Sequence, residues 1–257
     1  MLKVDRQNLI EKKIKEKGSI LISNLVGFFD CSLETIRRDL IEMEKQGRII
    51  RTFGGAYIPD KFNKSVPISL RSTMLTTEKN YIAKKAINHI SDCDVIFLDS
   101  SSTCASLANE IANSNIAVTI ITNSTLVIRI ICDSSIRNNN VKLVSLGGEY
   151  KNSTSSLTGQ VTLDTIDNFI ATKSFISCPH IDAKIGLTDN DIESAYIRKA
   201  MIKNSTKTIV LADHTKLNNN SDVKIVELSN INHLITDKKV DIEFEKKLRE
   251  LNISLEY

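Results

Sequence analysis

The sequence lacks any CxxC pair, and its five cysteines are scattered at positions 31, 93, 104, 132 and 178. This spacing excludes a zinc ribbon and argues against a disulfide scaffold, so we expect buried or idle thiols. The sequence also lacks an apolar run of about 18 residues, which argues against a transmembrane helix. Its opening residues, Met1 to Arg6, contain no apolar signal-peptide core. We therefore expect a cytoplasmic protein without a membrane partner.

Positive charge is in excess only in the first quarter of the chain. Hydrophobic residues make up 41% and charged residues 25% of the 257 residues, which is typical of a globular chain of one or two domains. Residues 1–58 contain 11 Lys and Arg against 8 Asp and Glu, whereas residues 59–257 contain 23 of each. A small basic module before a neutral body favours a DNA-binding head on a separate domain, although so small an excess also arises by chance.

The first 58 residues contain three stretches with helical spacing. The first stretch ends at Gly18, the second follows Ser23, and the third follows Ser32, which can cap it. The third helix has apolar residues at offsets of 0, 3, 7 and 10, which predicts one buried stripe: Leu33, Ile36, Leu40 and Met43.

The outward face of the third helix has the chemistry of a recognition helix. Thr35, Arg37 and Arg38 follow Ser32 in its first turns, and arginine can grip guanine edges or phosphates. Residues 48–57 then predict a hairpin wing, in which Arg51, Gly54 and Gly55 could meet phosphates. The alternative is an ordinary helical subdomain with a solvated arginine pair.

The remainder of the chain alternates Val- and Ile-rich strands with helices, which predicts a mostly parallel sheet covered on both faces. The fold class that we expect is therefore α/β: a winged helix-turn-helix head at 1–58, a linker at 59–76 and a helix-covered sheet domain at 77–257. Strands are expected at 95–98, 118–121, 141–144, 174–176, 208–211, 224–228 and 233–235, and helices around 105–112, 125–132 and 192–203.

Polar residues follow several of these strands at their carboxyl ends, where sheets of this kind bind ligands. The first such loop places hydroxyls and amides at the start of a helix, which predicts an anion site suited to phosphate, although a plain helix cap is the alternative. The residues that we expect at the ligand are Asp99, Ser100, Ser101, Ser102 and Thr103 from that loop, with Thr122, Asn123, Gly147 and Gly148 from the next two.

Four charged or hydroxyl residues follow later strands: Asp182, Thr188, Glu193 and Lys216. Together they would suit a phosphorylated polyol, with lysine at the phosphate and a carboxylate at the sugar hydroxyls. Taken singly, each is more often a solvated surface group. We expect no metal site and no cofactor, because His180 is the only histidine near this crevice and has no second ligand at a useful spacing.

Two sets of motifs resemble those of DeoR-family transcriptional regulators. The head contains the run ETIRRDL at 34–40, Gln46-Gly47 and Gly54-Gly55-Ala56. The body contains LDSSST at 98–103, TNS at 122–124, LGG at 146–148, TG at 158–159, ID at 181–182, GLT at 186–188 and LAD at 211–213 with Lys216.

The resemblance implies an effector domain similar to sugar-phosphate isomerases of the ribose-5-phosphate isomerase type. By it, residues 100–103 would hold the phosphate of the effector and Asp182 would face its sugar hydroxyls. The chain departs from the family at Ser101, where glycine is usual, and at Ser177-Cys178-Pro179-His180, where a small glycine-containing segment is usual.

The leading hypothesis is a DNA-binding transcriptional regulator, a repressor of sugar-metabolism genes controlled by a phosphorylated sugar and not an enzyme. Because one helix reads few base pairs, we expect a homo-oligomer, a dimer or tetramer, on a double-stranded DNA operator. One alternative is a sugar-phosphate isomerase with Glu193 or Asp182 as its base. The other, favoured by Pro179 and His180, is a body that only oligomerises.

Overall fold

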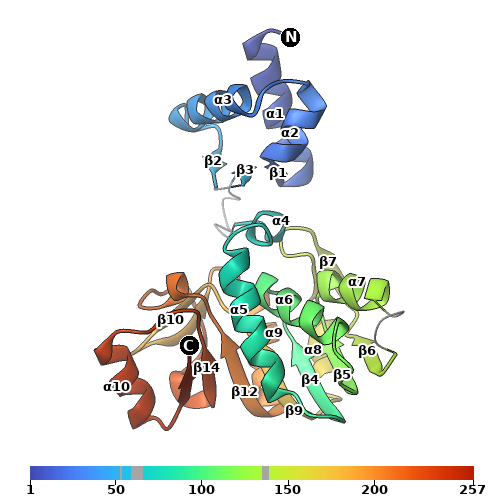
Figure 1. The fold of residues 1–257 in the computed structure, drawn as a ribbon, viewed down its shortest axis with the longest axis vertical. Helices are drawn as coiled ribbons and strands as arrows, with labels where there is room; N and C mark the ends of the chain where they lie inside the picture. Colours follow the sequence, from blue (N-terminus) through green and yellow to red (C-terminus); the bar gives the residue numbers. More distant parts are fainter. Residues whose placement is uncertain (53, 59–65, 135–138) are drawn as a thin grey trace. The chain divides into compact units, whose positions relative to one another are not determined.

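The computed structural model describes residues 1–52, 54–58, 66–134 and 139–257. The chain divides into two compact units, Met1–Met74 and Leu75–Tyr257. Within the described ranges, no helix combines the length and apolar character needed to cross a membrane. The expected class, a helix-turn-helix head followed by an α/β domain with a parallel sheet, is confirmed (Figure 1).

Among its described residues, the first unit contains four helices and a small antiparallel sheet of order β1-β3-β2. Nine buried apolar residues from the helices and the sheet form its core. Its elements are α1 (Lys3–Lys17), β1 (Ser19–Leu21), α2 (Ile22–Phe29), α3 (Leu33–Lys45), β2 (Ile50–Arg51), β3 (Gly55–Tyr57) and α4 (Ile68–Arg71).

Local sequence sets the ends of the helices in the head. Gly18 ends α1 at φ 79°, and its N–H donates to the carbonyl of Ile14. Ser32 caps α3 by accepting from the N–H of Thr35 at 3.1 Å. The predicted apolar stripe of α3 holds except at its first position, because Leu33 is 44% exposed. Asp39 is buried on this face instead.

The segment for which we expect a linker begins outside the described residues, since 59–65 are not described. Its second half forms α4, whose Ile68 and Leu70 are buried. The hydroxyl of Ser69 lies 2.7 Å from that of Ser19 in β1. This helix therefore packs on the head, and the first unit extends to Met74.

The second unit is built on a seven-stranded sheet of order β15-β14-β12-β9-β4-β5-β6, in which every neighbouring pair is parallel. The central strands are buried along most of their length, as in a parallel sheet that is covered on both faces. They are β4 (Asp94–Leu98), β5 (Val118–Thr122), β6 (Val141–Ser145), β9 (Ala171–Ile176), β12 (Ser205–Leu211), β14 (His233–Ile235) and β15 (Ser254–Glu256).

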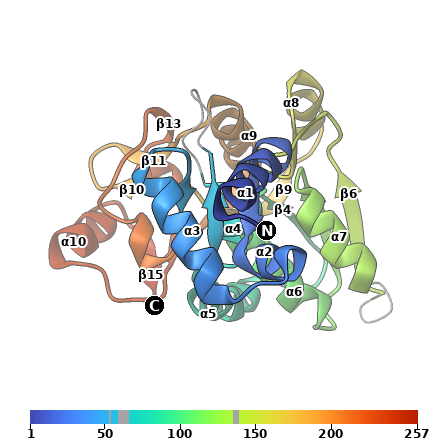
Figure 2. The same ribbon diagram turned by 90° about the horizontal axis from the view of Figure 1, so that it is seen from above.

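Helices cover both faces of this sheet. In β4, for example, Ile96 and Leu98 pack with one helical layer and Phe97 with the other. Figure 2 shows α5 and α6 on one side of β4 and β9, with α8 and α9 on the other. The first layer is α5 (Thr76–Ala86), α6 (Ser102–Ala112) and α7 (Thr125–Ser134); the second is α8 (Gln160–Ile166), α9 (Ile192–Lys203) and α10 (Ile242–Glu250).

Smaller elements flank the main sheet. The expected strand at 224–228 pairs antiparallel in a separate sheet of order β10-β11-β13 and is not part of the parallel sheet. These elements are β7 (Glu149–Lys151), β8 (Ser156–Thr158), β10 (His180–Asp182), β11 (Gly186–Asp189) and β13 (Val223–Val226), with the 3-10 turns η1 (Ile87–His89), η2 (His214–Lys216) and η3 (Leu228–Asn230).

The order of the main sheet places its topological switch point between β4 and β9. From β4 the chain moves outward through β5 to β6, and from β9 it moves the other way through β12 and β14 to β15. Loops that leave the carboxyl ends of adjacent strands at such a point part in opposite directions. This is the place where an open α/β sheet binds its ligand.

Candidate DNA-binding helix and effector site

Helix α3 presents two arginines to solvent on the face opposite its buried stripe. Arg37 and Arg38 are exposed, while Ile36 is fully buried. The Arg38 side chain is 78% exposed, and its Nε lies 3.3 Å from an oxygen of Glu34 one turn earlier. An exposed pair of this kind contributes little stability, so the guanidinium can turn to another partner at small cost. At the start of the helix, Thr35 is partly exposed.

Two partly buried arginines, which our sequence analysis missed, anchor α3 to α1. Arg6 of α1 donates to the carboxylate of Asp39, which is 2% exposed, and this hydrogen bond raises the pKa of Arg6. Arg48, just beyond α3, donates to Glu11 at 2.7 Å and to Asn8 at 2.9 Å. The Asp of the ETIRRDL run therefore supports the helix from inside.

Of the three wing residues expected at phosphates, Arg51 is exposed, whereas Gly55 is buried. The backbone N–H of Arg51 donates to Glu44 at 2.9 Å, and its side chain is within 3.7 Å of the same carboxylate. Gly55 is buried in β3, where a Cβ would lie 2.1 Å from the carbonyl oxygen of Ile20. This glycine is thus required for close packing, and its burial corrects the expectation of a phosphate contact. Gly54 is partly exposed.

Asp99 joins the two strands at the switch point of the main sheet. It follows β4 and is 1% exposed. One carboxylate oxygen accepts from the N–H of Ser101 in its own loop at 2.9 Å, and the other accepts from the N–H of Ser177 after β9 at 3.1 Å. Asp99 therefore shapes the loop after β4 and holds it to the loop after β9.

Arg198 of α9 neutralises this buried carboxylate, and our sequence analysis did not identify it. Its side chain is 6% exposed, its Nε donates to Asp99 at 2.7 Å, and its Nη1 donates to Asp189 of β11. Burial lowers the pKa of Arg198, but the carboxylates of Asp189 and Asp99 outweigh burial and raise it above its ordinary value. The guanidinium stays charged and bridges two carboxylates.

The hydroxyl loop after β4 closes tightly onto the start of α6. All four hydroxyl residues from Ser100 to Thr103 are less than 8% exposed. The hydroxyl of Ser101 accepts from the N–H of Cys104 at 3.0 Å, so Ser101 is the helix cap. Ser100, Ser102 and Thr103 have no capping role, and they surround the positive end of the α6 dipole.

The loop after β5 contains a hydrogen-bond acceptor without a partner among the described residues, and the loop after β6 contains a tight turn of two glycines. Thr122 donates to the carbonyl of Leu98, which ties β5 to β4, and the Asn123 amide donates to Leu157 at 3.0 Å. The other Asn123 atom, Oδ1, is buried without a hydrogen-bond partner among the described residues. Gly147 and Gly148 have φ of 70° and 113°, a region in which glycine is favoured.

Asp182 and Thr188 belong to the hairpin of β10 and β11. Asp182 accepts from the N–H groups of Lys184 and Ile185, both at 2.8 Å, and so forms the hairpin turn. Thr188 is fully buried and accepts from the N–H of Ser221 at 2.9 Å. Both side chains thus accept hydrogen bonds from neighbouring backbone N–H groups.

Glu193 and Lys216 lie in different surroundings. Glu193 at the start of α9 is 2.6 Å from Lys151 of β7, which also contacts Asp191 at 2.7 Å. Lys216 ends the short turn η2 after β12, and its positive charge acts on Cys178 and His180. Lys216 therefore supplies a positive charge near the loop after β9, whereas Glu193 is paired with Lys151.

In the unusual segment after β9, Ser177 and Cys178 are buried, whereas Pro179 and His180 are partly buried. Burial raises the pKa of the Cys178 thiol to about 12, so the thiol stays protonated. Burial, followed by the charge of Lys216, lowers the pKa of His180, whose Nδ1 lies 2.7 Å from the hydroxyl of Ser221. His180 therefore belongs to the hairpin sheet and has a structural partner.

Two family models match the chain: the DeoR-like helix-turn-helix domain over residues 6–62 and the DeoR C terminal sensor domain over residues 75–238. The HTH-type transcriptional regulator YulB of Bacillus subtilis is 30% identical and covers 99% of this chain and 96% of its own. The lactose phosphotransferase system repressor of Staphylococcus epidermidis is 31% identical (96% and 97% covered), and the glycerol-3-phosphate regulon repressor of Escherichia coli is 28% identical (100% and 99%).

Among solved structures, ribose 5-phosphate isomerase A of Methanocaldococcus jannaschii is 20% identical over 54% of this chain and 53% of its own, with a TM-score of 0.40. The three relatives at full length are transcriptional regulators and not enzymes, as expected for this chain. Both matched domains, the DNA-binding helix-turn-helix and the sensor, follow each other along the chain in the order expected from its motifs. The chain therefore belongs to the DeoR family of DNA-binding transcriptional regulators.

Proposed function

We propose that the protein is a repressor of sugar-metabolism genes and that a phosphorylated sugar controls its binding to an operator. The observation that carries the proposal is the pairing of an arginine-bearing helix in the head with polar loops at the switch point of the body. Two relatives support it by name, as repressors of a lactose phosphotransferase system and of a glycerol-3-phosphate regulon. Such a regulator acts on chromosomal DNA, in the cytoplasm of a bacterium.

In the head, α3 enters the major groove with its amino end toward the bases. Arg37 and Arg38 contact guanine edges or phosphates, and Ser32 and Thr35 contact the backbone at the start of the helix. Gly54 and Arg51 lie near the backbone at the wing. One such helix reads only a few base pairs, so two heads of a dimer or tetramer bind paired half-sites.

In the body, the phosphate of the effector binds at the start of α6. Ser100, Ser102 and Thr103 supply hydroxyls there, and the helix dipole together with Lys216 supplies positive charge. The carboxylate of Asp99 is held by Arg198 and so adds little repulsion. The unpartnered Oδ1 of Asn123 accepts from a sugar hydroxyl.

The DNA-binding half is tested by titrating labelled operator duplex, selected from chromosomal fragments on the immobilised protein. Arg38→Ala should weaken binding by about 5- to 150-fold, since a good bidentate base contact is worth about 1–3 kcal/mol. Arg129 of α7 is a matched control, because it is 79% exposed and pairs one turn away with Asp133. If Arg38→Ala and Arg129→Ala bind the operator equally well, α3 is not the reading helix.

The effector half is tested by calorimetry of the full chain against a panel of sugar phosphates and their unphosphorylated sugars. Only phosphorylated compounds should bind, and Ser102→Asp should abolish the heat of binding by placing a negative charge at the phosphate. An aspartate in the first turn of a helix favours the helix dipole, so the variant should remain folded. If no compound binds, the proposed effector site is refuted, and the alternative of a body that only oligomerises is favoured.

A further inference from the structure

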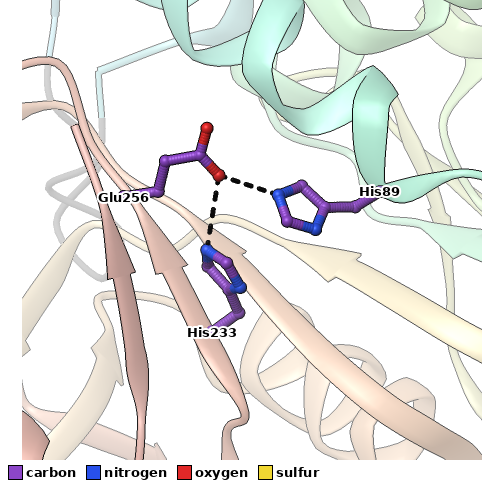
Figure 3. A group of neighbouring side chains, drawn as sticks. All are labelled: His89, His233 and Glu256. Atoms are coloured by element: carbon purple, nitrogen blue, oxygen red, sulfur yellow. Dashed lines mark hydrogen bonds and ion pairs between the residues drawn. The ribbon is translucent and has the colours of Figure 1, made fainter.

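Two histidines and a glutamate meet at one edge of the main sheet, away from the loops described above. His89 lies in η1 directly after α5, His233 begins β14, and Glu256 lies in the edge strand β15. Figure 3 shows the two imidazole rings with their Nε2 atoms facing the same carboxylate oxygen of Glu256. The three side chains are between 18% and 30% exposed, so the group is partly buried.

The distances within this group suit a small cation. Oε2 of Glu256 is 2.8 Å from Nε2 of His89 and 3.6 Å from Nε2 of His233. One ligand atom from each residue lies within 4.8 Å of the others. Tetrahedral zinc with bonds of about 2.0–2.2 Å places its ligand atoms about 3.3–3.6 Å apart, so small side-chain rotations suffice to close the site.

One polar atom of the group is left without a partner in this arrangement. Nε2 of His233 is buried and has no hydrogen-bond partner among the described residues, since 3.6 Å to Glu256 is too long for a hydrogen bond. A buried polar atom without a partner is costly, and such atoms point to an ion or a group that completes them. An ion bound by all three residues satisfies this nitrogen.

Lys85 of α5 occupies the other carboxylate oxygen. Its Nζ lies 3.3 Å from Oε1 of Glu256, which holds the carboxylate in place and leaves Oε2 directed at the histidines. Glu256 can therefore offer a single oxygen to an ion while it keeps its ion pair with Lys85. The opposite charges of Lys85 and Glu256 offset each other, and the two imidazoles bind a metal in their neutral form.

We propose that His89, His233 and Glu256 form a binding site for a divalent transition-metal ion, with zinc the best match. Two imidazoles and one carboxylate are a known donor set for zinc, and water completes the fourth position on the open side. The bound ion links the edge strand β15 and its neighbour β14 to the end of α5. Because the ligands come together only in the folded chain, the ion stabilises the second unit.

The test uses the full chain, stripped of metal with a chelator and titrated with Zn²⁺ by calorimetry. We expect one zinc per chain and a rise in the melting temperature on zinc addition. His233→Gln, His89→Gln and Glu256→Gln should each weaken zinc binding by more than about 100-fold, since loss of outer-shell partners alone costs 10–100-fold. Circular dichroism of each metal-free variant checks its fold, and His89→Gln, at a partly exposed position, keeps a polar side chain beside Glu256.

Two controls separate this site from other donors in the chain. His214→Gln removes a histidine that is bonded to Asp237 elsewhere in the second unit, and it should leave zinc affinity unchanged. Co²⁺ should give the visible bands of a tetrahedral ion with nitrogen and oxygen ligands. The proposal is overturned if wild-type protein takes up no zinc, if the three substitutions leave uptake unchanged, or if Co²⁺ shows a thiolate charge-transfer band.

Discussion

Replacing Arg198 by methionine removes the cation that neutralises two buried carboxylates at the switch point of the sheet. Asp99 and Asp189 are 1% and 3% exposed, and Arg198 donates to both. Methionine fills most of the space, so the main consequence is electrostatic. In Arg198→Met, the folded protein must bury two carboxylates without their partner or take up a proton.

The expected loss is large compared with the stability of a domain. Removing one partner of a buried ion pair costs about 3–5 kcal/mol, whereas whole domains are stable by about 5–15 kcal/mol. Arg198→Lys should lose less, because it keeps the charge but not the planar fork that reaches both carboxylates. The loss should shrink toward pH 5, since a buried carboxylate without arginine has a raised pKa and binds a proton more readily folded than unfolded.

Urea unfolding followed by tyrosine fluorescence measures this loss. The chain has no tryptophan, and all its tyrosines except Tyr57 lie in the second unit, so the signal reports mainly that unit. Arg249→Met is the matched control, since Arg249 is 78% exposed and pairs with Glu245 one turn away on α10. This control should change stability by less than about 1 kcal/mol. Equal midpoints for Arg198→Met and Arg249→Met would refute the role given to the buried network.

Two further predictions concern backbone strain and pH. Gly148→Ala should destabilise the protein by about 1–3 kcal/mol or more, because its φ is 113° and a Cβ would lie 2.1 Å from Oγ1 of Thr162. Gly27→Ala, inside α2 with no atom within 4 Å of the added Cβ, should stabilise the protein by about 0.5–1 kcal/mol. Melting curves followed by circular dichroism test both substitutions. A Gly148→Ala protein as stable as the wild type would contradict the first prediction. Burial and Lys216 lower the pKa of His180 below its ordinary value of about 6.5, so the unfolded chain binds the proton first and stability falls as pH drops below about 6.5. His180→Asn should reduce this fall between urea midpoints at pH 7.5 and 5.5, and an unchanged fall would exclude His180 as its source.

Periodicity was sufficient to predict the main elements of the fold. Nearly continuous apolar runs in segments such as 95–98 and 208–211 mark strands that are covered on both faces, and the structure contains both in the parallel sheet. The segment at 224–228 includes the charged residues Lys224 and Glu227, and it pairs antiparallel with β11. These exposed charges fit a strand that is not covered on both faces, but its pairing partner is set by tertiary contacts.

The loops of the candidate site could be predicted from the sequence, but the buried residues that hold these loops in place could not. Hydroxyls at 100–103 follow a buried strand directly, so sequence position alone indicated the loop. Arg198 lies 99 residues beyond Asp99 and in the middle of a helix, where an arginine is usually a solvated residue. Asp182 is the last residue of β10 and forms the hairpin turn, since aspartate readily accepts from the next N–H groups. Long-range partners and local turns of this kind are visible only in the folded chain.

Stability alone does not explain the buried network at the switch point. Burying two carboxylates and one guanidinium costs desolvation that well-packed apolar residues would avoid, so such a network is weak support for a purely stabilising role. Here Asp99 uses its two carboxylate oxygens to fix the loops after β4 and β9, and the guanidinium of Arg198 neutralises the negative charge of Asp99. The result is a rigid set of hydroxyls and amides at the start of α6. On the proposed function, such a site would be prepared for a phosphate before the ligand arrives, which would lower the ordering cost of binding.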